Sequence, residues 1–501
     1  MCKSSGEKLV RKVKEMQMKL GEVDIAGITF DLRSRDEIPQ LLMGLQHIWC
    51  TPELREQVFA ILEKIVPEGT SPDTGRPGME LWKVLVLGTL RLNCNWDFDK
   101  VHEMANQHNT LRQMLGHAFM DQSYQYPIQT IKDNVQLLTP FVLDEINQVV
   151  VKAGHNLVKK NCAVGLNGRC DSFVVETDVH FPTDINLLLD AMRKVIELTA
   201  RLCSAYGIDG WRQCGHNFNK IKKLYRRAQQ IKASNSPDEA KKGKQQEVIK
   251  EAYLAYLEVA QQFIERAQAS IAMLEQKGCC ELQQLLIITA YIKHGQRQID
   301  QIKRRVVLGE VIPHNEKVFS IFEEHTEWIR KGKAGVPQEL GLKVCIVEDQ
   351  HRFILHHRVM GQETDEQIAV SITQEAKQRF PDLNSCSYDK GFHNATNRGE
   401  LETILNRVVL PKKGKLSQQD KEREHNPEFM QERRRHSGVE SAINAVENHG
   451  LDRCLDHGLE GFKRYAALAM VARNMQVLGR ILQQKELKRL KKRQTHYRLA
   501  A

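Results

Sequence analysis

The chain has 501 residues, of which 41% are hydrophobic and 27% charged, which is long enough for about two to four domains that each bury a core. It carries 73 Lys and Arg against 63 Asp and Glu, a formal net charge of +10, and an excess of this size suggests a polyanionic partner. The sequence excludes an apolar membrane span, since no run of about 18 apolar residues occurs, and its cysteines show neither zinc-finger nor disulfide spacing.

The beginning of the chain, MCKSSGEKLVRKVKEMQMKL, lacks the apolar centre of a signal peptide, which predicts a cytoplasmic protein. Residues 1–38 are predicted to be a polar leader. Residues 39–155 show helical periodicity in four consecutive stretches, which predict a compact all-helical N-terminal domain. These stretches are PELREQVFAILEKIV, ELWKVLVLGTLRL, FDKVHEMANQHNTLRQMLG and PIQTIKDNVQLLTPFVLDEINQVVVKAG.

The character of the sequence changes at about residue 156. The stretch RCDSFVVETDVH is rich in β-formers and lies between Asn167-Gly168 and Pro182, which predicts a strand. Residues 187–331 turn helical again, with long periodic segments such as EVIKEAYLAYLEVAQQFIERAQASIAMLEQ. Their periodicity predicts antiparallel helices in a hairpin or small bundle.

Strands return after residue 332. LKVCIVE and HRFILHHRV are predicted strands, followed by the helix TDEQIAVSITQEAKQRF, a strand ending in SCSYD and the strand ILNRVVLPKKG. From about residue 427 the pattern is helical, and residues 481–501 form a basic C-terminal tail. Residues 156–190 and 332–480 together therefore predict one mixed α/β domain with acidic residues at the ends of its strands.

Three of these acidic residues are widely separated in the sequence. Asp171 stands among β-formers, Asp389 stands where a strand meets a turn, and Glu440 stands on a predicted helix. Taken singly, each has a simpler explanation, respectively an edge position, a turn-initiating Asp and a solvent-facing Glu. Taken together, they offer the hard oxygen ligands that Mg²⁺ prefers. Two such ions about 3.5–4 Å apart can activate a nucleophile and neutralise charge on a phosphate.

The residues around these acids resemble the motifs of a known family, the bacterial insertion-sequence DDE transposases. DSFVVETDVHFPTD, which begins at Asp171, resembles the strand that carries the family's first Asp. SYDKGFHN, with Asp389, resembles the second-Asp motif, and RRRHSGVESAINAVENHGLDRC, with Glu440, resembles the third motif and its helix. ELGLKVCIVE and GRPGMELWKVLVLGTL are further similarities, so the resemblance covers most of the chain.

The resemblance implies an α/β RNase H-like catalytic domain with a long helical insertion, preceded by an all-helical N-terminal domain that binds DNA ends. Asp171, Asp389 and Glu440 would bind two Mg²⁺ ions, for which Mn²⁺ could substitute. The implied reaction is cleavage at the element ends, followed by strand transfer of the 3′-OH into target DNA. The implied partners are terminal inverted repeats, target DNA and at least one further copy of the chain, in a cytoplasmic protein at the nucleoid.

The chain departs from the Tyr-Arg-Glu-Lys signature of many members of this family. Arg433 stands at the Tyr position, His436 at the Arg position and Glu447 at the Lys position. Asp178 and Asp184 compete with Asp171 for the first role, although a turn near Pro182 explains both, and Glu176 and Glu348 are similar cases. Asp171 is preferred because it stands earliest in the strand and matches the motif best.

Basic residues near the predicted site are expected to hold DNA phosphates. These residues are Arg433, Arg434, Arg435, Lys412, Lys413 and Lys415. Lys488 to Arg493, at the end of the chain, are predicted to make general backbone contacts or to be a solvated face. Two alternatives to an active transposase stay open: a catalytically decayed transposase-derived DNA-binding protein, and a nuclease of the same fold that hydrolyses DNA without strand transfer.

Overall fold

The computed structural model describes residues 11–12, 23–66, 76–119, 121, 123–158, 165–233, 235–330 and 338–500. Much of the predicted leader therefore lies outside the described residues. The chain divides into two compact units, unit 1 with residues 1–178 and 329–501 and unit 2 with residues 179–328. The fold is mixed α/β and 65% helical. Within the described ranges, no helix has the length and apolar character needed to cross a bilayer.

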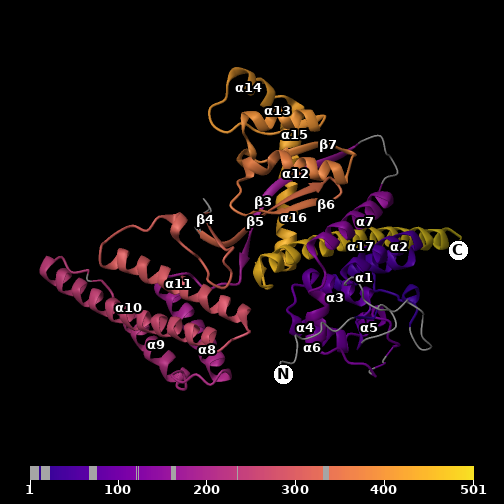
Figure 1. The fold of residues 1–501 in the computed structure, drawn as a ribbon. Coiled ribbons are helices and arrows are strands. Elements are labelled where there is room, and N and C mark those ends of the chain that lie inside the picture. The colour runs from indigo at the N-terminus through magenta and orange to yellow at the C-terminus, as the bar shows by residue number, and fades with distance from the viewer. Residues whose placement is uncertain are drawn as a thin grey trace. The chain divides into compact units, whose positions relative to one another are not determined.

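Among the described residues, seven α-helices form the N-terminal region of unit 1, which confirms the helical character predicted there (Figure 1). They are α1 (Glu37–Cys50), α2 (Pro52–Leu62), α3 (Leu81–Asn93), α4 (Phe98–Gln107), α5 (Asn109–Met114), α6 (Ile128–Val135) and α7 (Pro140–Val158). The stretch FDKVHEMANQHNTLRQMLG contains two helices because His108 adopts an extended conformation between them. Its imidazole accepts a hydrogen bond from the Leu111 amide and so caps α5.

The sheet of unit 1 has seven strands in the order β4-β5-β3-β7-β8, with β6 paired to β5 and β9 paired to β3. Their bounds are β3 (Leu166–Thr177), β4 (Glu327–Arg330), β5 (Gln338–Asp349), β6 (Ile354–Val359), β7 (Leu383–Tyr388), β8 (Arg407–Val409) and β9 (Arg453–Cys454). The strand β3 runs antiparallel to β5 and parallel to β7, and β7 runs parallel to β8. All the predicted strands are present, whereas the short strands β4 and β9 were not predicted.

Helices pack against both faces of this sheet. On one side lies α12 (Asp365–Arg379), whose Thr373 hydroxyl hydrogen-bonds the Tyr388 hydroxyl of β7 at 2.7 Å. On the other side lies α15 (Pro427–His436), because His436 hydrogen-bonds the Ser387 hydroxyl at 3.0 Å. Successive side chains of a strand point to opposite faces. The remaining helices of this part of the chain are α13 (Ala395–Ile404), α14 (Gln418–Glu424) and α16 (Gly438–Val446).

The long C-terminal helix α17 (Gly458–Ala500) joins the N-terminal helices to the sheet. The Asn474 side chain of α17 accepts a hydrogen bond from the Ile354 amide of β6 and donates to the Ile354 carbonyl, both at 2.8 Å. It also donates to the Asn147 side chain of α7 at 2.7 Å, and both asparagines are buried. Since a buried amide needs such partners, this junction fixes three elements at one point. The N-terminal helices and the sheet accordingly share one hydrophobic core.

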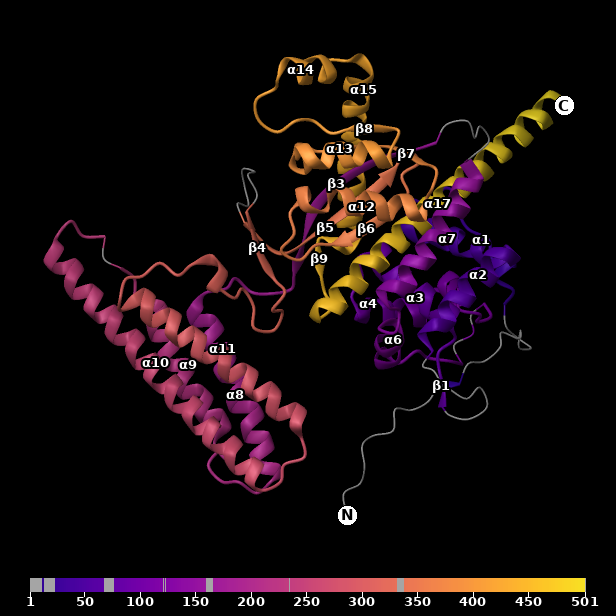
Figure 2. The ribbon, with the colours of Figure 1, turned by 45° about the horizontal axis from the view of Figure 1, so that its top comes forward.

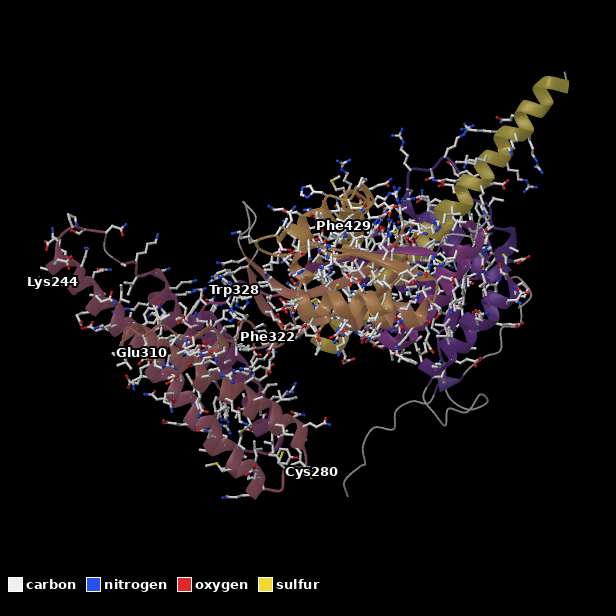
Figure 3. All side chains as sticks on the ribbon, turned by 90° about the horizontal axis from the view of Figure 1, so that it is seen from above. Lys244, Cys280, Glu310, Phe322, Trp328 and Phe429 are labelled. Carbon is white, nitrogen blue, oxygen red and sulfur yellow. The ribbon has the colours of Figure 1, made fainter. Side chains whose placement is uncertain are left out.

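Unit 2 is helical and has a core of its own. Its helices are α8 (Asp184–Ala205), α9 (Cys214–Gln230), α10 (Glu239–Gln276) and α11 (Leu282–Val306). Buried side chains recur along α10 at helical spacing, so they form one stripe on the helix. Lys244, near the start of α10, and Cys280, in the turn before α11, lie at opposite ends of this unit (Figure 3). The helical character predicted for residues 187–331 holds through Val306, whereas Glu327–Arg330 form the strand β4, which pairs with β5.

Candidate functional site

Two of the three predicted acids, Asp171 and Asp389, lie on neighbouring parallel strands. Cys170 of β3 is the register partner of Tyr388, the last residue of β7, so Asp171 and Asp389 follow at the same level of the sheet. Tyr388 points toward α12, and the next residue of each strand therefore points to the opposite face. The two carboxylates thus share the face on which α15 lies.

Glu440, the third predicted acid, is exposed in the first turn of α16, which packs against β3. Burial raises the pKa of Asp171 to about 6, and the negative charges of Asp389, Asp365 and Glu440 act in the same direction, while a hydrogen bond from the Ser172 amide opposes them. The carboxylates of residues 171, 389 and 440, far apart in sequence, are therefore brought within electrostatic range of one another.

The donor chemistry of this cluster is that of a divalent-cation site. Carboxylate oxygens are the ligands that Mg²⁺ and Mn²⁺ take up, and like charges that repel one another are relieved by a cation. In the part of the chain that the structure describes, no three His, Cys, Asp or Glu side chains stand close enough together to hold a metal ion. Coordination by all three acids would therefore require side-chain movement, for which the exposed Glu440 is the obvious candidate.

A fourth acid, Asp365, adjoins the cluster and was missed by the sequence analysis. It is the first residue of α12, and its carboxylate accepts hydrogen bonds from the Ser172 hydroxyl at 2.6 Å and from the Lys343 ammonium at 3.1 Å. In the sequence, Asp365 follows Thr364 in a helix-capping pattern, which accounts for an acid there without any site. Only the approach of α12 to β3 reveals its proximity to Asp171.

An ion pair between β3 and β5 lies next to the start of α16. Arg169 of β3 contacts the Glu348 carboxylate of β5 at 3.2 Å, and Glu348 is only 2% exposed. Burial raises the pKa of Glu348 to about 7, although the positive charge of Arg169 acts in the opposite direction. A β-carbon on Gly438 would overlap the Arg169 guanidinium. Glycine at position 438 thus allows α16 to approach β3 closely, two residues before Glu440.

We therefore expect Gly438→Ala to displace the Arg169 guanidinium from Glu348, leaving a buried carboxylate without its partner. The expected cost is about 1–3 kcal/mol of unfolding free energy, and any shift of α16 moves Glu440, so a reaction at this site should slow about 100-fold. Chemical denaturation and a cleavage assay measure the two effects. The matched control is Gly399→Ala in α13, where nothing lies within 4 Å of a β-carbon; equal effects of both substitutions would contradict this account.

His436, predicted to stand at the Arg position of the transposase signature, lies within electrostatic range of Asp389 and Glu440. Its Nδ1 lies 3.0 Å from the Ser387 hydroxyl, two residues before Asp389. Burial lowers the pKa of His436, whereas the negative charges of Asp389 and Glu440 raise it. The lowered pKa favours a neutral imidazole at pH 7. The imidazole thus tethers β7 to α15 without adding a permanent positive charge.

The predicted DNA-contacting residues form two groups, the lysines after β8 and the arginines of α15. One member of each group contacts Glu424, at the end of α14. The Lys412 amide donates to the Glu424 carboxylate at 2.8 Å, and the Arg433 guanidinium lies 3.7 Å from the same group. Lys412 also pairs with Asp420, and Arg435 pairs with Glu432. The other three predicted cations are exposed, namely Arg434, Lys413 and Lys415. Among the described residues, no hydrogen bond or ion pair engages their side chains.

The competing acids are engaged elsewhere. Glu176, near the end of β3, lies 3.1 Å from the Arg453 guanidinium. Asp178, just after β3, lies 3.8 Å from the same guanidinium. Asp184 is the first residue of α8 in unit 2, where it pairs with Arg305 at 2.7 Å. The charges of Asp389 and Glu440 act on Asp171, which supports Asp171 for the first position.

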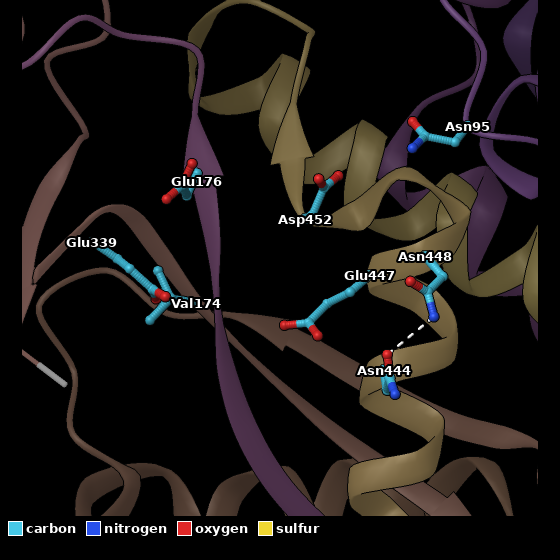
Figure 4. Close-up of a pocket in the computed structure, with 8 residues that line it drawn as sticks. All are labelled: Asn95, Val174, Glu176, Glu339, Asn444, Glu447, Asn448 and Asp452. Carbon is cyan, nitrogen blue, oxygen red and sulfur yellow. Dashed lines mark hydrogen bonds between the residues drawn. The ribbon is translucent and has the colours of Figure 1, made fainter. Parts of the chain in front are cut away.

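A pocket of about 460 Å³ lies farther along β3, in unit 1 (Figure 4). Its lining includes four carboxylates, no Lys, Arg or His, and none of the three predicted catalytic acids. The lining residues are Asn95, Val174, Glu176, Glu339, Asn444, Glu447, Asn448 and Asp452. These carboxylates give the pocket a negative potential, which repels a phosphate in the absence of a cation. Glu447, predicted to stand at the Lys position of the transposase signature, is one of these four carboxylates.

Comparison with known proteins gives no match: no protein-family model, no curated protein sequence and no solved structure is significantly similar to this chain.

Proposed function

We propose that this chain is a DNA transposase whose catalytic domain is RNase H-like and is interrupted after its first strand by the helical unit 2. The observation that carries the proposal is the convergence of acids from three distant parts of the sequence. Asp171 and Asp389 share one face of the sheet at adjacent positions, and the charge of Glu440 reaches Asp171 from α16. A mixed sheet with β3 at its centre positions the first two.

In this proposal Asp171, Asp389 and Glu440 would hold the magnesium ions. Bound there, the ions supply an activated nucleophile and neutralise charge on the phosphate under attack. The chain's own residues position the DNA and the third acid. Arg434 and the exposed lysines after β8 bind phosphates that flank the cleaved bond, and the Arg169–Glu348 pair keeps α16 against β3.

The second candidate is the DNA-binding protein without catalysis. Two observations favour it: the acids of the cluster do not stand at coordinating distance among the described residues, and Glu447 carries a negative charge where the family has Lys. Both candidates predict DNA binding, so binding alone does not separate them.

One assay separates these candidates. The full-length protein is incubated with Mg²⁺ and duplexes that carry the inverted repeats flanking its gene, and the products are examined for nicked 3′ ends and for joined strands. We expect wild-type protein to nick and join, and Asp389→Asn to lose nicking at least about 1,000-fold while binding persists. The control Asp209→Asn removes an acid whose side chain is 84% exposed in unit 2 and should keep activity.

Three results would change the assignment. Nicking by Asp389→Asn at the wild-type rate would contradict the site. Wild-type protein that binds but never nicks would favour the non-catalytic candidate. Nicked ends that are never joined to target DNA would indicate a nuclease.

A further inference from the structure

The C-terminal part of α17 extends past the last residue that unit 1 buries. Gln483 is 7% exposed and donates a hydrogen bond to the Leu32 carbonyl. After it, Lys485 still donates to the Leu157 carbonyl at the end of α7, at 2.6 Å. From Lys488 onward the described side chains are exposed, and the helix projects beyond α1 and α7 (Figure 2). We call residues 484–494 the arm.

The arm concentrates the positive charge of the protein. Its eleven residues, QKELKRLKKRQ, include six basic side chains and one acidic side chain, a net charge of +5. That is half of the formal net charge of the 501-residue chain. Nitrogen-tipped side chains project from this end of α17 (Figure 3). Because like charges on one helix repel each other, such a concentration is unfavourable unless an anion offsets it.

The charges of the arm are ordered around the helix. Lys485, Lys488, Arg489 and Lys492 follow the spacing i, i+3, i+4, i+7, which places them on one face. Leu487 and Leu490 continue the opposite face, on which Gln483 is buried. Arg489 is held only loosely by Glu486, at 3.6 Å. In the described part of the chain, no ion pair or hydrogen bond engages Lys488 or Lys492.

We propose that the arm binds the phosphate backbone of duplex DNA without reading its sequence. The basic stripe is about 10 Å long at 1.5 Å per residue, which is close to the about 12 Å width of the major groove. Its cations can therefore meet phosphates, whose density on duplex DNA makes them the matching polyanion. Contacts to phosphates are the same for every base sequence, so cations that meet phosphates hold DNA in place without specifying a site.

This inference goes beyond the proposed function and does not depend on catalysis, because it is tested on DNA of random sequence without Mg²⁺. The test variant carries Lys488→Gln, Arg489→Gln and Lys492→Gln in the full chain. Glutamine is a good helix former, so the helix should persist, as circular dichroism can verify. The charge-keeping control is Lys488→Arg with Lys492→Arg. The control for loss of charge elsewhere carries Lys241→Gln, Lys242→Gln and Lys244→Gln, all exposed at the start of α10.

The measured quantity is the dissociation constant for a random 30-base-pair duplex at several salt concentrations. For the arm variant we expect the dissociation constant at 0.1 M salt to rise about 10- to 100-fold, and the slope of its logarithm against log salt to fall by about 2–3. The charge-keeping control should match wild type. Unchanged affinity and slope in the arm variant overturn the proposal, as does an equal loss in the α10 control. Wild-type binding to phosphatidylserine vesicles that is lost in the arm variant, with DNA binding intact, would assign the arm to a membrane surface instead.

Discussion

Asp171→Asn is expected to abolish Mg²⁺-dependent DNA cleavage and, in the absence of metal, to stabilise the protein at pH 8. The carboxylate of Asp171 is half-buried beside three other acids, and its pKa is raised from 3.8 to about 6. An ionised group held in this way destabilises the folded state, because the unfolded chain ionises it more easily. Asparagine has nearly the same shape and carries no charge, but it is a much poorer metal ligand.

The sign of the effect follows from the two pKa values. Well below pH 3.8 the carboxyl is protonated in both states and Asp171 contributes no penalty. Between pH 4 and pH 6 the unfolded chain loses its proton first, so stability falls as pH rises. Above pH 6 the penalty is complete, and a shift of about two pKa units corresponds to about 3 kcal/mol. The gain from Asp171→Asn should therefore be about 3 kcal/mol at pH 8 and only about 0.5 kcal/mol at pH 4.

Guanidinium unfolding of both proteins in a chelating buffer at the two pH values measures this gain. Added Mg²⁺ should stabilise the wild type, since a ligand that binds only the folded state adds to its stability, and should leave Asp171→Asn unchanged. Asp209→Asn again serves as the control. A wild type whose stability does not respond to Mg²⁺ at pH 8, with a variant no more stable than it, would mean that the acids do not form the proposed site.

Gly479→Ala is expected to lower the unfolding free energy of unit 1 more than Gly438→Ala does. In the contact between α1 and α17, a β-carbon on Gly479 would overlap the carbonyl oxygen of Gln40, and a β-carbon on Gly44 would overlap that of Met475. These obstacles are backbone atoms of packed helices, so they cannot rotate away as a side chain could. The helices would have to separate along a buried contact, and overpacking of this kind costs about 3 kcal/mol or more.

The matched control is Gly243→Ala in α10, where no atom lies within 4 Å of a β-carbon. There alanine should stabilise the helix by up to about 1 kcal/mol, because glycine is the poorer helix former. Thermal unfolding followed by circular dichroism should thus shift in opposite directions for the two substitutions. A Gly479→Ala protein as stable as wild type would show that α1 and α17 do not meet at their backbones.

The elements of this protein and its acids could be predicted from the sequence because both leave local signals. β-formers around Asp171, the strand before Asp389 and the helical period of the third motif depend on neighbours within a few residues. The break at His108, and the strands β4 and β9, were missed because they are short and because capping or pairing decides them. Whether the acids serve a transposase stays a prediction.

The amino-acid sequence by itself determined most of the helices, the longer strands and three of the four clustered acids, since these follow from local periodicity and residue type. The tertiary structure decided which groups meet: Asp365 beside Asp171, Arg169 against Gly438, and Glu424 between the two basic groups. It also decided that α17 binds the N-terminal helices and the sheet into one core. The physical reason is that these contacts join residues up to hundreds of positions apart, and strand register and helix packing, which fix them, leave no pattern in any short stretch of sequence.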